Sequence, residues 1–153
     1  MATASTTTVA REELQDFIRP RHKALLSTTR ADGRPQLSPV SCGLDTEGRI
    51  VVSTYPQRAK ARNIRKDPRV TVCVMSEDWN GAYVQVDGTG EVLDLPDAME
   101  PLVDYFRVIS GEHPDWDDYR AAMTRQGKCL IRVTIERWSP ISTGGFPAHL
   151  NMD

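Results

Sequence analysis

The chain has 153 residues, of which 39% are hydrophobic and 26% are charged, and these values are typical of one globular domain with one core. Its formal net charge of −2 excludes the polycationic proteins that bind nucleic acid by bulk phosphate neutralisation, so any anion site has to be local. No apolar run approaches the roughly 18 residues of a membrane span, and the first ten residues lack the basic and apolar regions of a secretory signal, so we expect a cytoplasmic protein without a membrane partner.

The first half of the chain predicts a helix followed by three strands. Apolar residues share one face between Val9 and Ile18, and Pro20 ends this short amphipathic helix. Three antiparallel strands then follow in succession, and an Asp-Gly pair in the link 31–34 favours a hairpin turn between the first two. These strands are predicted at residues 24–30, 36–44 and 49–54.

The second half returns twice from helix to strand. Residues 57–67 have the composition of an exposed basic helix that stops before Pro68, since the residue preceding a proline is disfavoured in the α conformation. In the second of the next two strands, Gly88 and Gly90 predict a bulge or a sharp bend. The remaining elements are strands at 70–75 and 82–95, a helix at about 99–109, a helix at 116–126 with Asp115 as its N-cap, and a strand at 129–139.

Six strands with short helical insertions predict a mainly β fold. The strict alternation of strand and helix that marks a parallel sheet is absent, so we expect a six-stranded antiparallel barrel with accessory helices, in which closure removes exposed strand edges. The expected organisation is a flexible N-terminus at 1–10, one cofactor-binding barrel domain at 11–142 and a C-terminal tail at 143–153.

Other catalytic and metal-binding patterns are not supported. Cys42, Cys73 and Cys129 are too scattered for a zinc or redox motif and are expected to be buried and reduced. The acidic residues around His113 suit a helix start without any metal, so we expect no metal site. The chain also lacks a nucleophile elbow, a Rossmann glycine pattern and a Walker loop, which disfavours covalent hydrolysis and an enzyme that uses a nicotinamide cofactor or a nucleoside triphosphate.

The segment after the third strand carries the most chemical information. It places the hydroxyls of Ser53 and Thr54 at a strand end and Arg58 and Lys60 in the first turn of the helix that follows. Free N–H groups and the helix dipole favour an anion there, Arg58 can grip two phosphate oxygens, and Lys60 adds a point charge. These four residues predict a phosphate site. The alternative interpretation is a basic helix face that is only solvated.

Three segments also carry a family resemblance. They are GRPQLSPV at 33–40, RAKARNIRKDPR at 58–69 and GEHPDWDDYR at 111–120, and the similarity extends in order over roughly residues 12 to 142. In these segments the chain resembles the actinobacterial F420-dependent members of the pyridoxamine 5'-phosphate oxidase-like superfamily. The resemblance implies the FMN-binding type of split β-barrel.

The resemblance also implies where a cofactor lies. Arg58 and Lys60 match the family's Arg-x-Lys that binds the cofactor phosphate, and Asn63 is a further candidate at that end. Pro39 departs from the asparagine of close relatives, and proline offers no side-chain hydrogen bond to the ring. The polar side chains implied to lie along the flavin-like ring and its ribityl chain are Gln36, Ser38, Ser53 and Thr54.

Members of the superfamily are homodimers with the cofactor at the interface, so the resemblance implies a homodimer whose partner chain completes each site. Trp79, in the polar loop 76–81, is a candidate to stack on the ring, and the alternative is that it only caps one end of the barrel. Residues 142–153, including His149, are either a second segment that reaches across the interface or a disordered tail.

The leading functional hypothesis is an F420H2-dependent oxidoreductase that passes a hydride from the deazaflavin to a small electron-poor substrate. Its catalytic residues stay unassigned, because cofactors of this type supply the chemistry themselves. Two alternatives stay open, namely an FMN-binding flavoprotein of the same fold and a non-catalytic protein that carries F420 or another cofactor. The basic row Arg62, Arg65 and Arg69 favours F420, whose oligoglutamate tail carries negative charge that FMN lacks.

Overall fold

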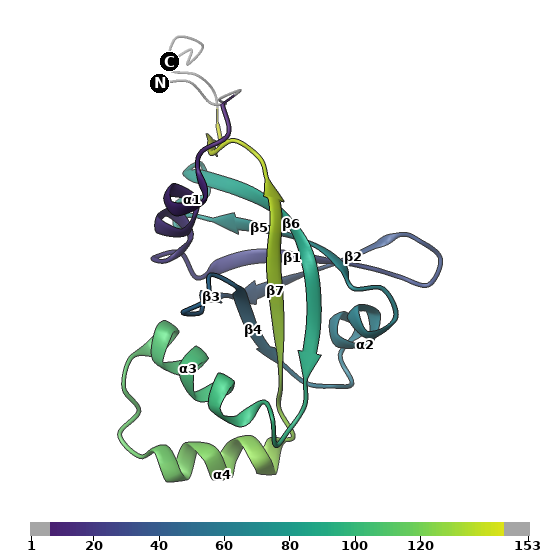
Figure 1. Cartoon of the computed structure of the whole chain (residues 1–153), viewed down its shortest axis with the longest axis vertical. Coiled ribbons are helices and arrows are strands. Elements are labelled where there is room, and N and C mark those ends of the chain that lie inside the picture. The colour runs from purple at the N-terminus through teal and green to yellow at the C-terminus, as the bar shows by residue number, and fades with distance from the viewer. Residues whose placement is uncertain (1–6, 146–153) are drawn as a thin grey trace.

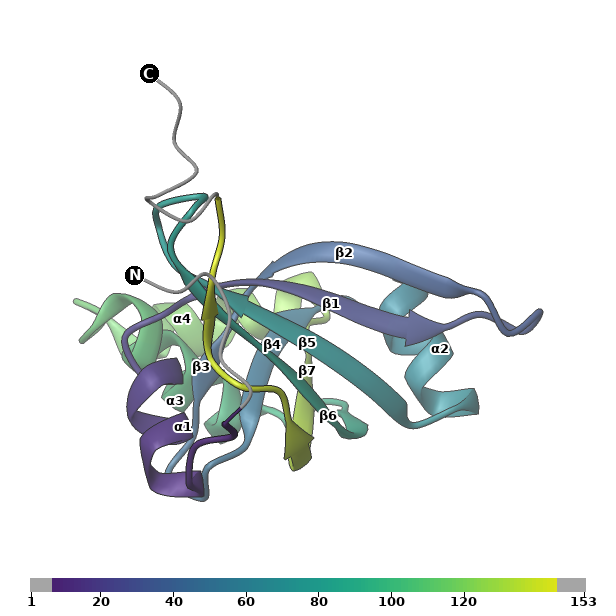
Figure 2. The same ribbon diagram turned by 90° about the horizontal axis from the view of Figure 1, so that it is seen from above.

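The computed structural model describes residues 7–145, in which one antiparallel sheet curls into a half-barrel with four helices around it (Figures 1 and 2). The mainly β fold predicted from the sequence is therefore confirmed. The strands are β1 (Lys23–Thr29), β2 (Pro35–Ser41), β3 (Gly43–Leu44), β4 (Ile50–Thr54), β5 (Arg69–Met75), β6 (Ala82–Leu93), β7 (Cys129–Trp138) and β8 (Ser142–Thr143). The helices are α1 (Arg11–Ile18), α2 (Ala59–Lys66), α3 (Met99–Ser110) and α4 (Trp116–Gln126).

The sheet bends back on itself through its strand order. The order is β2-β1-β5-β6-β7-β4-β3, with β8 beside β6, and all of these pairs are antiparallel. The two ends of this path, β2 and β3, are consecutive in the chain and only Cys42 separates them. The predicted count of six strands is too low for the described residues, because the segment 36–44 divides at Cys42 and Ser142–Thr143 adds a short strand.

The turns and the bulge follow from glycine. Gly33 has a φ of +85° in the β1–β2 turn, where its N–H donates to the Arg30 carbonyl at 2.9 Å. The predicted bulge in β6 is confirmed, since the register against β7 shifts between Asp87 and Gly88. A Cβ atom at Gly88 would collide with the carbonyl oxygen of Thr134, so only glycine allows β7 to approach this closely.

Two hydrophobic cores lie on opposite faces of β4 and β7. Val52 belongs to the core inside the barrel, which Leu14 and Ile18 of α1 also enter. Val51, the residue before it, belongs to a second core that α3 and α4 close over the outer face. Neighbouring residues separate in this way because side chains alternate along a strand. The helices divide in the same way, because α1 and α2 both contribute to the inner core, whereas α3 and α4, which lie side by side in Figures 1 and 2, cover the outer face.

Both ends of α4 match their local signals. Asp115 is the N-cap of α4 as predicted, because its carboxylate accepts the Asp118 N–H at 3.1 Å. Gly127 ends the same helix with a φ of +64°. The predicted leading and basic helices are each shorter in the structure, where α1 begins at Arg11 and α2 ends at Lys66. No helix among residues 7–145 is long and apolar enough to cross a membrane.

Candidate functional site

Two strand edges lack a strand partner in the described sheet. β2 pairs with β1 along one edge only, and β4 pairs with β7 on one side but reaches β3 only at Ile50 and Val51. The free edges of residues 35–41 and 52–54 are joined by β3, and β2 also contacts β4. Free edges present backbone N–H and C=O groups that can bind a ligand. We call the region between these two edges the split.

The N-terminus of α2 lies at one end of the split. β4 ends at Thr54, and a turn closed by the Arg58 N–H on the Tyr55 carbonyl at 3.0 Å leads directly into the helix. Arg58 occupies the N-cap position, is exposed, and has no ion-pair partner among residues 7–145. Lys60 is half-buried, and burial together with the nearby Arg58 charge lowers its pKa. Unpaired cations at a helix N-terminus favour an anion.

A chain of hydrogen bonds fixes α2 against β1 and β2. The Asn63 amide donates to the Thr28 hydroxyl at 3.1 Å, and that hydroxyl donates to the Gln36 side-chain oxygen at 3.0 Å. Two of the predicted site residues, Asn63 and Gln36, are therefore brought together through Thr28, which is only 1% exposed. Sequence reasoning missed Thr28. A polar residue on the apolar face of β1 was the signal that could have found it.

Ser38 carries an unpaired polar atom. It is half-buried on the same face of β2 as Gln36, two residues away, and its hydroxyl oxygen is buried with no hydrogen-bond partner among the described residues. A buried hydroxyl without a partner is unfavourable by about 1 to 3 kcal/mol, and such a group calls for an explanation. A ligand group that bonds to Ser38 would supply one.

Ser53 and Thr54 do not face the same way. Thr54 is 5% exposed and alternation places its side chain on the barrel side with Val52, whereas Ser53 is half-buried on the side of α3. Only one of these two side chains can face a ligand on a given side of the sheet, while their backbone edge is shared.

Tyr105 of α3 lies at the converging end of the split. Its hydroxyl donates to the Ser41 carbonyl at 2.8 Å, at the last residue of β2. Burial raises the pKa of Tyr105, and hydrogen bonding with Ser53 partly offsets this rise. Tyr105 is a second residue that sequence reasoning missed, because it lies off the apolar face by which the helix was predicted.

Trp79 is not brought to the other predicted residues within one chain. It is 83% exposed in the turn between β5 and β6, which is the end of β5 opposite α2. Seven residues of strand span about 20 Å. Trp79 instead lines a cavity of about 440 Å³ together with Met75 and Tyr83.

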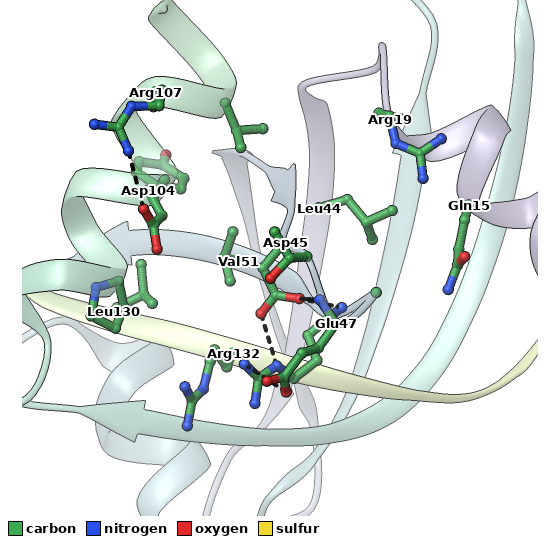
Figure 3. Close-up of a pocket in the computed structure, with 16 residues that line it drawn as sticks. Gln15, Arg19, Leu44, Asp45, Glu47, Val51, Asp104, Arg107, Leu130 and Arg132 are labelled. Carbon is green, nitrogen blue, oxygen red and sulfur yellow. Dashed lines mark hydrogen bonds and ion pairs between the residues drawn. The ribbon is translucent and has the colours of Figure 1, made fainter. Parts of the chain in front are cut away.

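A second cavity, of about 750 Å³, lies between α1, α3 and the turn that joins β3 to β4 (Figure 3). None of the eight predicted site residues lines it, although Tyr105 does. The cavity therefore lies beside the split and shares one side chain with it.

The predicted basic row is interrupted. Arg65 donates to both carboxylate oxygens of Asp94 at 2.7 Å. Arg69 lies in β5 rather than on the helix and pairs with Asp67 at 2.6 Å, and hydrogen bonds from Arg69 lower the pKa of Asp67 to about 2. Arg62 alone of the three has no ion-pair partner in the described part of the chain, so less positive charge is free for a polyanionic tail than the sequence suggested.

The acidic residues around His113, after α3, make local hydrogen bonds and ion pairs. Glu112 pairs with Arg107 at 2.7 Å and accepts the Trp116 ring N–H at 3.1 Å. The ring nitrogen of His113 accepts the Asp115 N–H at 2.9 Å. These contacts hold the link between α3 and α4.

Comparisons with known proteins agree on the fold. Residues 10–142 match the family model described as pyridoxamine 5'-phosphate oxidase. A conserved hypothetical protein from Mycobacterium tuberculosis, Rv2991, is 20% identical, with a TM-score of 0.74 over 94% of this chain and 90% of that one. A protein named F420 reductase is 24% identical, with a TM-score of 0.61 over 81% and 94% of the two chains. HutZ from Vibrio cholerae, described as a heme storage protein, is 17% identical, with a TM-score of 0.63 over 87% and 95%.

Proposed function

The chain belongs to the pyridoxamine 5'-phosphate oxidase family, and from this premise we propose that it is an F420H2-dependent reductase that binds its cofactor along the split. The observation that supports the proposal most is the pair of cations, Arg58 and Lys60, at the start of α2 directly after β4. Neither has an acidic partner among residues 7–145, so this end of the split suits a phosphate.

The rest of the split suits the tricyclic ring of such a phosphorylated cofactor. The backbone edges of β2 and β4 offer donors and acceptors to a planar ring, and the unpaired hydroxyl of Ser38 offers one more. When bound, the reduced deazaflavin supplies the hydride. The protein orients the ring through these groups. Tyr105, whose hydroxyl donates to the Ser41 carbonyl, limits the far end.

We further propose a homodimer, supported by the outer face of the sheet. Leu37 is 62% exposed, and Pro39, on the same face of β2, is also exposed. The strand register extends this face across β1, β5 and β6 through Leu25, Cys73, Met75 and Tyr83. A strip of apolar side chains that are exposed or half-buried suits a second copy of the chain. A partner is also the means by which Trp79 would reach a cofactor ring.

FMN is a second candidate for the cofactor. It is favoured by the ion pairs Arg65–Asp94 and Arg69–Asp67, which remove two cations from the group that would attract the acidic tail of F420. The phosphate end of the site is the same for both cofactors.

The test is a titration of the purified protein with F420 and with FMN, followed by cofactor fluorescence. Arg58→Ala and Lys60→Ala should each weaken binding by about 1.5 to 3 kcal/mol, the range for a hydrogen bond to a charged group. Arg125→Ala, a change at an exposed arginine in the last turn of α4, should leave the affinity unchanged. Arg65→Ala should matter far less, and only for the cofactor with the long tail.

The outcomes separate the candidates. Unchanged affinity in both site variants would reject the phosphate assignment. Tighter binding of FMN than of F420 would favour the FMN flavoprotein. Stoichiometric F420 binding without hydride transfer to quinones, enones or biliverdin-like acceptors would indicate a carrier.

A further inference from the structure

The cavity of about 750 Å³ beside the split has walls from four elements (Figure 3). Arg19 directly follows α1 as its C-cap, Arg49 comes from the turn between β3 and β4, Arg107 from α3 and Arg132 from β7. Segments that lie far apart in the sequence thus bring four guanidinium groups to one hollow. None of the residues assigned above to the cofactor phosphate contributes to it.

Arginine outweighs carboxylate in this lining. Four arginines face three acidic residues, on a chain whose net charge is −2. All three acids are already engaged, because Arg49 binds Asp45 at 2.8 Å and Glu47 at 3.1 Å and Arg107 binds Asp104 at 3.4 Å. Outside the lining, Arg19, Arg107 and Arg132 also pair with Asp16, Glu112 and Glu91. Recognition of an anion in this cavity therefore depends on the guanidinium N–H donors that these ion pairs leave free.

Two of the arginines keep free donors. Arg107 uses Nε on Glu112 and Nη1 on Asp104, which leaves Nη2 without a described partner. Arg132 uses Nε and Nη2 on Glu91, which leaves Nη1 without one, and its side chain is only 20% exposed. A guanidinium carries five N–H donors, so each can bind a carboxylate in addition to its present ion pair.

The remaining lining is apolar. Val51 and Leu130 come from the buried outer face of β4 and β7, Leu44 comes from β3, and Val108 of α3 is 39% exposed. Arginines around apolar side chains match a molecule that has an apolar body and an anionic group.

Tyr105 joins this cavity to the split. It lines the cavity, while its hydroxyl donates to the Ser41 carbonyl at the converging end of β2 and β4. A molecule in the cavity is therefore separated from the split by one side chain.

We propose that this cavity is a second binding site, which takes a small organic carboxylate with an apolar body. Binding in the cavity is independent of the cofactor assignment. The further role of the bound carboxylate as the partner of the cofactor in the redox reaction rests on the proposed function.

The experiment is a methyl NMR titration of the whole protein with 2-naphthoate and with its neutral analogue, 2-naphthamide. We expect 2-naphthoate to shift the methyl signals of Val108 and Leu44 and to leave that of Leu37, on the outer face, in place. The amide should bind about tenfold more weakly, because it lacks the charge that the arginines recognise. Equal affinity for the two probes, or shifts confined to residues outside the cavity, would overturn the proposal.

Substitutions localise the charge effect. Arg107→Gln and Arg132→Gln should each weaken 2-naphthoate binding by about tenfold, the value for one charge-assisted hydrogen bond. The matched control is Arg120→Gln, because Arg120 pairs with Glu100 and does not line the cavity. Equal losses in the control and in both site variants would contradict the assignment.

The same titration separates this proposal from the cofactor proposal. Arg58→Ala should weaken cofactor binding and leave the response to 2-naphthoate unchanged. If neither F420 nor FMN binds but the cavity methyl signals still shift, the second site stands without the redox function. If the cofactor binds and 2-naphthoate produces no shift, the cavity proposal is wrong.

Discussion

Thr28 joins three elements of the candidate site through one hydroxyl, which receives from Asn63 and donates to Gln36. Thr28→Val keeps the shape and removes both hydrogen bonds, so we expect a loss of about 1 to 2 kcal/mol in the free energy of unfolding, measured by urea denaturation. The exposed Thr124→Val in α4 is the control and should change stability by less than about 0.5 kcal/mol. A loss no larger than that of the control would show that the hydrogen-bonded chain does not hold α2 in place.

Two buried thiols should make the free energy of unfolding depend on pH. Burial raises the pKa of Cys42 and of Cys129 to about 11, from an ordinary value of 9.0. Because the pKa of such a thiol is higher in the folded than in the unfolded state, the thiol contributes its full stabilisation below about pH 9. This contribution is lost as the pH rises toward 11. Cys42→Ala should therefore flatten the fall in urea midpoint between pH 9 and pH 11. An unchanged slope would argue against a buried, protonated thiol at this position.

Single residues were predictable from the sequence where their chemistry is local. Arg58 and Lys60 stand at a helix start, and residue type together with spacing was enough to mark them as candidates. Thr28 and Tyr105 act on residues 35 and 64 positions away in the chain, and no local pattern carries that information. The half-burial and free hydroxyl of Ser38 likewise depend on the curvature of the sheet.

Elements were predicted best where a cap or a bulge marks them. α4 occupies the predicted residues 116–126, and Asp115 caps it as expected. The segment 36–44 was predicted as one strand, because its strand-like pattern continues without a break across all of these residues. It divides at Cys42 because the first part pairs with β1 and the second with β4, and the choice of neighbours is set by the whole sheet.

Two glycines of β6 offer a matched comparison at this scale. At Gly88 an added Cβ would collide with a backbone carbonyl of the paired strand, whereas at Gly90 it would meet the side-chain ends of Ile64 and Val70 at 3.3 Å. Gly88→Ala should therefore lower the free energy of unfolding by about 2 to 3 kcal/mol, and Gly90→Ala by about 1 kcal/mol or less. Thermal and urea unfolding of the two variants provide the measurement. Similar losses in both would contradict the close approach of β6 and β7.

The proposed homodimer is a property of the whole molecule. A charge at the most exposed position of the apolar outer face, Leu37→Glu, should convert a dimer into a monomer in sedimentation velocity, since an unpaired charge cannot be buried at an interface. Ala121→Glu, at an exposed position of α4, should leave the dimer intact. A wild-type protein that sediments as a monomer at micromolar concentration, or a Leu37→Glu variant that remains dimeric, would contradict an interface on this face.

The overall architecture followed from strand pattern and turn residues, because hydrophobic alternation specifies which face of each strand is buried. The arrangement of free edges did not follow from the sequence. It arises where β2 and β4 diverge from their junction at β3, and it depends on pairings between distant strands.

The most direct test of the account is a crystal structure of the protein with F420 bound. We predict that the cofactor phosphate lies within hydrogen-bonding distance, about 3 Å, of Arg58 and Lys60 at the start of α2, with the ring along the free edges of β2 and β4. A phosphate bound elsewhere, with the Arg58 guanidinium extended into solvent, would contradict the account.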